Sequence, residues 1–229
     1  MSAPPLRLLL IRHGEVLANR EMRYVGARDE PLADSGIAQA DRLAAALAPL
    51  PVQAVYSSPL ARARETGRRI AAARAVDLRI EPRLREQSFG EWEGLTRAEV
   101  LERDRERLLR WESDLGTSPP GGEPLTEVQA RMLALVQELA CGHRGENVAL
   151  VSHVGPIKAL LCAALGTPLA TARRMFLDPG TLSVVDWGER PVLRLFNAHG
   201  HNGWETARWM GDRGSPLHPP AKVEVRRRV

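Results

Sequence analysis

Two short apolar runs, each followed almost at once by a histidine, limit the folds open to this chain more than any other feature. The runs cover residues 6–11 (LRLLLI) and 147–152 (NVALVS). Nearly continuous apolar runs of this length are typical of strands that are buried on both faces, as in a parallel α/β sheet. Helical and strand-like segments alternate along the chain. The sequence therefore predicts an α/β fold, a three-layer α/β/α sandwich with a mostly parallel central sheet.

The remaining elements follow from hydrophobic periodicity and from turn signals. Helices are predicted at 34–47, with Asp34 or Ser35 as the N-cap, and at 59–73, 96–111, 126–141 and 156–165. Strands are predicted at 52–56 and 78–81, and a hairpin at 182–187 and 192–197 closes the fold. We expect one domain over residues 1–210, with a small cap or insertion around 85–125, and an extended basic tail at 211–229.

Length, charge and cysteine content exclude several classes of protein. The 229 residues are near the upper limit for one hydrophobic core. The net charge is +4, but residues 214–229 hold four basic side chains and one acidic one, so we expect no nucleic-acid partner. No apolar run approaches the roughly 20 residues of a membrane helix, and the N-terminus lacks a basic signal segment, so we expect no membrane partner and a cytoplasmic location. Cys141 and Cys162 form no Cys-x-x-Cys pair, which favours two buried, reduced thiols.

His13 lies two residues past the first apolar run, and His153 directly follows the second. In open α/β sheets, ligands bind in the crevice beyond the carboxyl ends of the strands, so both histidines are expected to face one crevice. Arg12 adds a cation beside His13, and a helix starting near Pro156 adds unpaired backbone N–H groups. These features together predict an anion site. The alternative is that two unrelated histidines happen to lie in loops.

Phosphoryl transfer is the chemistry that such a site suits. A neutral imidazole is a competent nucleophile toward phosphorus, and the migrating group carries negative charge that arginines can neutralise. Nearby arginines also disfavour the imidazolium, which keeps His13 unprotonated. The leaving alkoxide needs a proton, and either a carboxylic acid or a third histidine could supply it.

Six segments of the sequence carry a resemblance to a known family. They are LIRHGE at 10–15 with Asn19, GARDEPL at 26–32, SSPLARA at 57–63, LRE with FGEWEG between 84 and 94, GGE at 121–123, and VSH at 151–153. Their types and order resemble the histidine phosphatase superfamily (phosphoglycerate mutase-like), and the match extends over about residues 6–198. The resemblance implies the phosphoglycerate mutase-like α/β sandwich.

The resemblance also implies a role for each matching residue. His13 would be the nucleophile that becomes phosphorylated, and Glu86 would be the acid that protonates the leaving oxygen and then the base that activates water. Arg12, Arg62 and His153 would bind the phosphoryl group. The substrate pocket would be completed by Asn19, by Gly26 and by the backbone N–H of Val154, which stands where many members have glycine. No metal or organic cofactor is implied, and we interpret the His199-x-His201 spacing as a loop.

Spacing alone leaves several of these assignments open. Arg62 has three arginine neighbours within seven positions, and only the SSPLARA match distinguishes it. Glu123 could reach the substrate or fix its own loop. The carboxylates that compete with Glu86 for the acid role are Glu15, Glu91 and Glu93.

The compact segment 96–111 and the FGEWEG sequence resemble the phosphatase branch of the family. The predicted function is therefore that of a phosphomonoesterase acting on a small phosphorylated metabolite. One alternative is phosphoryl transfer of the cofactor-dependent phosphoglycerate mutase type. A second is a non-catalytic member that binds a phospho-ligand. The oligomeric state stays open, with a homodimer as one option.

Overall fold

A computed structural model describes residues 4–207 of the chain, and within them six strands form one sheet in the order β3-β2-β4-β1-β5-β6. The strands are β1 (Leu6–Arg12), β2 (Ala54–Ser57), β3 (Leu78–Ile80), β4 (Asn147–Ser152), β5 (Leu182–Trp187) and β6 (Val192–Ala198). β1 to β4 are mutually parallel, and β5 runs antiparallel to both of its neighbours. The mostly parallel sheet that the sequence predicts is confirmed.

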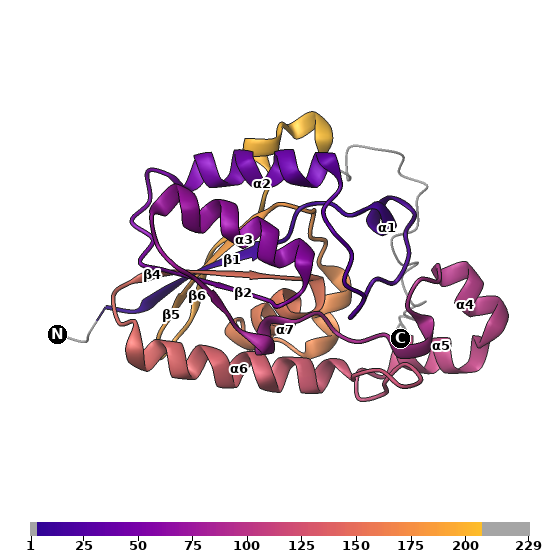
Figure 1. The fold of residues 1–229 in the computed structure, drawn as a ribbon. Coiled ribbons are helices and arrows are strands. Elements are labelled where there is room, and N and C mark those ends of the chain that lie inside the picture. The colour runs from indigo at the N-terminus through magenta and orange to yellow at the C-terminus, as the bar shows by residue number, and fades with distance from the viewer. Residues whose placement is uncertain (1–3, 208–229) are drawn as a thin grey trace, which may run out of the picture.

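Helices cover both faces of the sheet (Figure 1). α2 (Asp34–Leu47) and α3 (Ala61–Arg74) lie on one face, and α6 (Leu125–Gly142) and α7 (Val154–Ala164) lie on the other. Side chains alternate along a strand, so β1 contributes to two cores. Leu8 and Leu10 pack in the core that contains Leu160 of α7, whereas Leu9 and Ile11 pack in the core that contains α2 and α3. This arrangement is the predicted three-layer sandwich.

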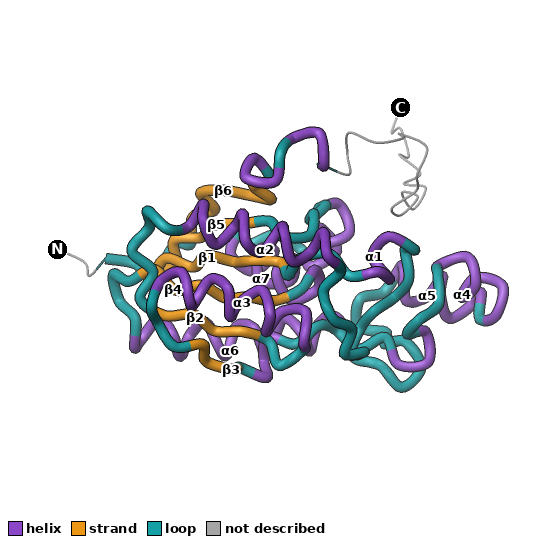
Figure 2. Tube along the Cα trace, turned by 45° about the horizontal axis from the view of Figure 1, so that its top comes forward, coloured by secondary structure: helices purple, strands orange, loops and turns teal. Residues whose placement is uncertain are grey.

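The carboxyl ends of β1 and β4 point toward the end of the molecule that carries α1 (Leu17–Arg20), α4 (Arg97–Arg103) and α5 (Arg105–Ser113) (Figures 1 and 2). α4 and α5 have a small core of their own, in which Val100 and Leu108 pack with Trp92. The remaining helical segments are short 3-10 turns: η1 (Pro82–Leu84), η2 (Gly90–Trp92), η3 (Leu169–Arg174), η4 (Gly200–Asn202) and η5 (Trp204–Thr206).

Several local predictions are wrong. The helix predicted over 96–111 is two helices, because Asp104, with φ −148° and ψ 53°, interrupts it. Ala33 is the N-cap of α2, not Asp34 or Ser35. α7 begins at Val154, two residues earlier than predicted, because Pro156 fits within the first turn, where backbone N–H groups have no partner inside the helix. Cys162 is buried and reduced as expected, but Cys141 is exposed.

The domain bounds 1–210 and the cap around 85–125 stay predictions, and the predicted tail at 211–229 lies outside the described residues. None of the helices within residues 4–207 is long and apolar enough to span a membrane.

Candidate active site

His13 and His153 meet at the carboxyl ends of two adjacent strands. β1 and β4 are parallel neighbours in which Arg12 lies opposite Ser152, so the residues that follow leave the sheet side by side. The backbone N–H of His13 donates to the carbonyl of Ser152 at 3.1 Å. The two imidazole rings have centroids 4.9 Å apart at 58°, and both residues are buried, with exposed fractions of 3% and 0%.

Hydrogen bonds define the tautomer of His13. Its Nδ1 lies 2.6 Å from the carbonyl oxygen of Gly14, which can only accept, so Nδ1 carries the hydrogen. The Nε2 lone pair accepts from Nε–H of Arg62 at 3.2 Å. Burial holds the pKa of His13 well below its usual range, and the charges of Arg62 and Arg12 lower it further. His13 is therefore a neutral imidazole whose Nε2 lone pair accepts a hydrogen bond from a cation.

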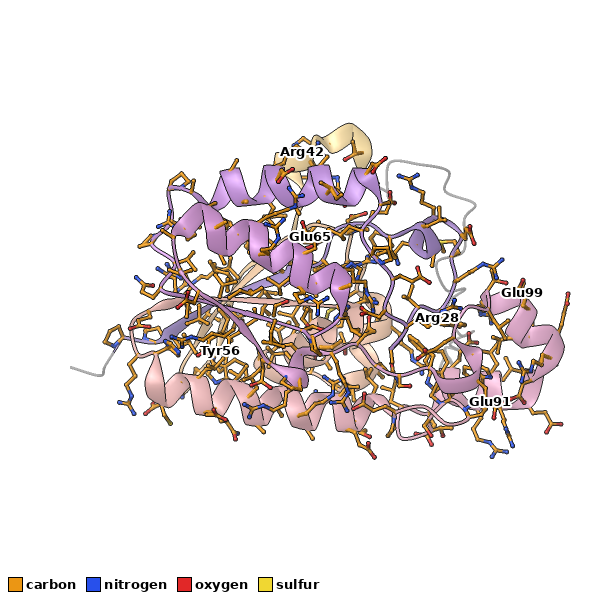
Figure 3. All side chains as sticks on the ribbon, in the orientation of Figure 1. Arg28, Arg42, Tyr56, Glu65, Glu91 and Glu99 are labelled. Atoms are coloured by element: carbon orange, nitrogen blue, oxygen red, sulfur yellow. The ribbon has the colours of Figure 1, made fainter. Side chains whose placement is uncertain are left out.

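Arg62 is held in place by the backbone of a distant loop. This side chain of α3 is 1% exposed, and its two terminal nitrogens donate to the carbonyls of Arg28 at 2.6 Å and of Gly26 at 2.7 Å. Figure 3 shows Arg28 between the sheet and the α4–α5 region. The neighbouring Arg68 instead pairs with Glu65 at the surface. Burial and loop contacts, which spacing cannot show, distinguish Arg62 within its helix.

Arg12 adds a second buried cation to the site, and His153 adds a second neutral imidazole. Arg12 is buried, and its guanidinium donates to the carbonyl of Leu177. His153 Nε2 forms a hydrogen bond with Ser58 Oγ at 2.8 Å, and its buried Nδ1 has no hydrogen-bond partner within residues 4–207. Burial lowers the pKa of His153 strongly, and Arg62 adds to the effect. A buried ring nitrogen without a partner needs an explanation, and a hydrogen bond to a bound group would be one.

Glu86 lies against the first turn of α7. Its Oε1 accepts hydrogen bonds from the backbone N–H groups of Gln87 at 2.9 Å and Gly155 at 3.1 Å. A Cβ on Gly155 would lie 2.6 Å from the same oxygen, so the carboxyl can approach this turn only because residue 155 is glycine. Burial raises the pKa of Glu86, although the two N–H groups and Arg62 oppose the shift. A buried carboxyl with a raised pKa is suited to donating a proton.

The competing carboxylates have other partners. Glu15 accepts from Arg20 and from Ser35. Glu91 pairs with Arg103 at the surface, and Figure 3 shows it beside α4 and α5. Glu93 Oε1 accepts from backbone N–H groups of two loops, at Ala27 and Phe89.

Glu123 of the GGE segment fixes its loop. Both of its carboxylate oxygens accept from Arg131, at 2.9 and 3.0 Å, and its carbonyl accepts from Gln87 at 2.7 Å. The structure thus ties the loop at 121–123 to the segment that carries Glu86.

The other predicted pocket residues occupy different places. Asn19 lies in α1, and its Oδ1 accepts from the N–H of Val16 at 3.3 Å. Gly26 has φ +54° and holds Arg62 through its carbonyl, and Val154 is the first residue of α7.

His201 bonds to the carbonyl of Gly180, and residues 4–207 contain no cluster of three His, Cys, Asp or Glu side chains that could hold a metal.

Sequence reasoning missed two residues at this site. Ser58, which contacts His153, belongs to the SSPLARA segment and has no predicted role of its own, although it lies just past a predicted strand, as His153 does. The sequence does not indicate that Gly155 supports Glu86, because the predicted helix begins after residue 155.

Comparisons with known proteins point to one family. The sequence profile of the histidine phosphatase superfamily (branch 1) matches residues 8–199. A bifunctional protein of Mycobacterium tuberculosis is 40% identical over 200 residues, which cover 86% of this chain and 55% of that protein. The chain thus spans about half the length of these mycobacterial relatives. Phosphoserine phosphatase 1 of Hydrogenobacter thermophilus is 34% identical over 193 residues, covering 83% of this chain and 92% of that enzyme.

Solved structures show the same fold. The α-ribazole phosphatase of Shigella flexneri superposes with a TM-score of 0.76 at 31% identity, covering 84% of this chain and 96% of that one. A mycobacterial glucosyl-3-phosphoglycerate phosphatase in complex with VO3 gives a TM-score of 0.78 at 30% identity, covering 84% and 98%. The sandwich fold is thus shared with proteins of known structure.

Proposed function

The chain belongs to the histidine phosphatase superfamily, and from that membership we propose that it is a phosphomonoesterase that hydrolyses a small phosphorylated metabolite through a phosphohistidine on His13. The observation that carries the proposal is the state of His13. Its proton is on Nδ1, its pKa is well below the usual range, and its Nε2 lone pair faces the buried guanidinium of Arg62. Relatives named for phosphoserine, α-ribazole phosphate and glucosyl-3-phosphoglycerate support a small phosphate ester as the substrate class.

In the first step, the Nε2 lone pair forms a bond to phosphorus while the bond from phosphorus to the ester oxygen breaks. Glu86 gives its proton to the departing oxygen, so the alcohol leaves neutral. Arg12, Arg62 and His153 stabilise the charge that develops on the three equatorial oxygens, which is the larger part of the catalysis in phosphoryl transfer.

In the second step, the Glu86 carboxylate removes a proton from water while the water oxygen attacks phosphorus. The phosphorus–nitrogen bond breaks, and inorganic phosphate leaves. Glu86 ends protonated and His13 ends neutral, so both groups return to the states that their burial favours. The same two residues thus serve both steps.

The test is release of inorganic phosphate from p-nitrophenyl phosphate by the wild type and by His13→Ala. We expect the variant to lose at least about 1,000-fold in kcat, because the nucleophile is removed. His143→Ala is the matched control, since His143 ends α6 near the start of β4, away from the site, where it bonds to Tyr56 and Glu146.

A wild type no faster than His13→Ala would contradict the proposal. A mutase would instead require a bisphosphate primer and would interconvert monophosphates without releasing phosphate. A non-catalytic member would bind inorganic phosphate and release none from the ester.

A further inference from the structure

Ser58 lies beside His153 and has no part in the reaction steps above. It directly follows β2, and its backbone N–H donates to the carbonyl of Val151 in β4 at 3.0 Å. Because β2 and β4 are parallel neighbours, Ser58 and His153 leave the sheet at the same edge. Both residues are fully buried. The 2.8 Å hydrogen bond between Ser58 Oγ and His153 Nε2 is therefore shielded from solvent.

The second contact of Ser58 Oγ shows in which direction this hydrogen bond runs. A backbone N–H can only donate, and the N–H of Leu60 donates to Ser58 Oγ at 3.3 Å. The Ser58 hydroxyl still has its own hydrogen to donate, and among the described residues the one acceptor that it contacts is Nε2 of His153. With a hydrogen on Nε2, the buried hydroxyl would have no acceptor, which costs free energy. Ser58 is therefore the donor.

Accepting from Ser58 fixes the tautomer of His153. Burial and the charge of Arg62 lower the pKa of His153, so the ring is neutral and has a single N–H. Because the lone pair of Nε2 accepts from Ser58, that hydrogen is on Nδ1. Nδ1 is buried and has no hydrogen-bond partner in the described part of the chain. His153 thus has an unused donor, and a phosphoryl group has three strong acceptor oxygens.

The two histidines are thereby prepared for different tasks. In His13 the carbonyl of Gly14 holds the hydrogen on Nδ1, which leaves a lone pair on Nε2. In His153 the hydroxyl of Ser58 donates to Nε2, which leaves the N–H on Nδ1. The ring centroids are 4.9 Å apart. One ring therefore has a nitrogen that can attack phosphorus, and its neighbour has a hydrogen that can be donated to an oxygen.

We propose that Ser58 is a positioning residue that fixes His153 in the tautomer whose Nδ1–H donates to the bound phosphoryl group. The proposal rests on the phosphatase function above, because that function assigns the phosphoryl group to His153. In the other tautomer, Nδ1 would have a lone pair, which repels the phosphoryl oxygens. Ser58 thus makes a neutral imidazole a donor to an anion, without the positive charge that burial and Arg62 disfavour.

The first experiment measures the tautomer directly. Long-range proton–nitrogen correlation spectra of protein labelled in histidine distinguish a protonated ring nitrogen from a bare one, and a His153→Gln variant identifies the signals of residue 153. We expect the hydrogen on Nδ1 of His153 in the wild type. In Ser58→Ala this tautomer should no longer predominate, because nothing donates to Nε2. Ser57→Ala is the matched control, since Ser57 is equally buried and its hydroxyl donates to the carbonyl of Ser58.

The second experiment measures the dissociation constant of inorganic phosphate by calorimetry, which requires no turnover. Ser58→Ala should weaken binding about 10-fold or more, which corresponds to the loss of one hydrogen bond to a charged group. Ser57→Ala should change the dissociation constant less than about threefold, because its hydroxyl does not contact His153.

The proposal is contradicted by a wild type that has the hydrogen on Nε2 of His153, a result that does not depend on the folding of any variant. A Ser58→Ala variant that keeps the wild-type tautomer, or that binds phosphate as tightly as the wild type, would also overturn it. The phosphatase function is tested separately, by release of phosphate from p-nitrophenyl phosphate. A wild type that releases none contradicts that function, whereas the wrong tautomer contradicts only the role of Ser58.

Discussion

The position of Glu86 suits it to the two opposite roles that are proposed for it. Burial favours its neutral form, and two backbone N–H groups directed at Oε1 favour its anion. These opposing effects reduce the free-energy difference between the protonated and the ionised form of Glu86. Such a group can give up a proton in one step and regain it in the next.

Replacing Glu86 with glutamine should separate the two steps. For alkyl phosphates we expect kcat to fall about 100-fold to 10,000-fold, because no acid protonates the leaving oxygen. For p-nitrophenyl phosphate, whose leaving group needs little protonation, a phosphoenzyme should accumulate because no base activates water. Rapid-quench measurement of acid-labile, alkali-stable protein phosphate checks this, with Glu91→Gln as the surface control. Full turnover of an alkyl ester by Glu86→Gln would contradict the assignment.

Individual residues differ in how well the sequence predicts them. Arg12, His13 and His153 can be found from the ends of two apolar runs. Arg62 can be identified only from the family motif, because neighbouring residues in α3 are also arginines at helical spacing. What distinguishes Arg62 is its hydrogen bonds to two backbone carbonyls that lie 34 and 36 residues away in the chain.

At the scale of the element, the first turn of α7 is the support of the site. His153 is its N-cap, and it contains the backbone N–H of Gly155 that binds Glu86. The φ angle of Gly155 is not positive. Alanine is therefore compatible with the backbone at 155, and only the space taken by Glu86 opposes it.

Gly155→Ala should reduce kcat/KM about 100-fold while the protein stays folded. The added Cβ would lie 2.6 Å from Glu86 Oε1 and displace the carboxyl, and a displacement of about 1 Å can cost that much in rate. Thermal unfolding should show little loss of stability, since alanine favours helix. Gly142→Ala in α6 is the matched control, because a Cβ there meets no atom within 4 Å. Equal activity in both variants would show that the approach of Glu86 to this turn is unimportant.

The break between α4 and α5 shows what element prediction lacks. The segment 96–111 is highly charged and has no glycine or proline, so its sequence indicates one helix. In the structure, Val100 and Leu108 both pack with Trp92, and the chain bends at Asp104 between them. Both side chains thus pack against a tryptophan outside the segment, which local periodicity cannot include.

For the whole molecule, two buried neutral histidines make stability depend on pH. The pKa values of His13 and His153 are lowered on folding, so below about pH 6.5 the unfolded chain binds more protons, and stability is lost as the pH falls. Glu86, whose pKa is raised, acts in the opposite sense, because its contribution is present at low pH and is lost as the pH rises. In the window just below pH 6.5, the two histidines should dominate.

We expect the free energy of unfolding to fall between pH 7 and pH 5.5 by up to about 1.4 kcal/mol per pH unit for each histidine. Urea unfolding at several pH values measures it. A variant with both His13→Asn and His153→Asn should show a smaller fall over the same range. An identical fall in the variant would mean that other groups cause it.

The layered architecture could be predicted because alternating apolar runs and helices allow few arrangements. The order of the strands could not. No local feature of residues 147–152 indicates that β4 lies between β1 and β2. β5 and β1, which also pair, are likewise far apart in the sequence. Both pairings arise from long-range packing.

The central place of β4 has a consequence for biosynthesis. β1 and β2 are synthesised long before β4, and they do not pair with each other in the folded sheet. Both pair with β4, which lies between them. A nascent chain that ends before residue 147 has neither the completed sheet nor the second imidazole. Catalytic activity should therefore appear in a single step, when β4 is inserted between β1 and β2.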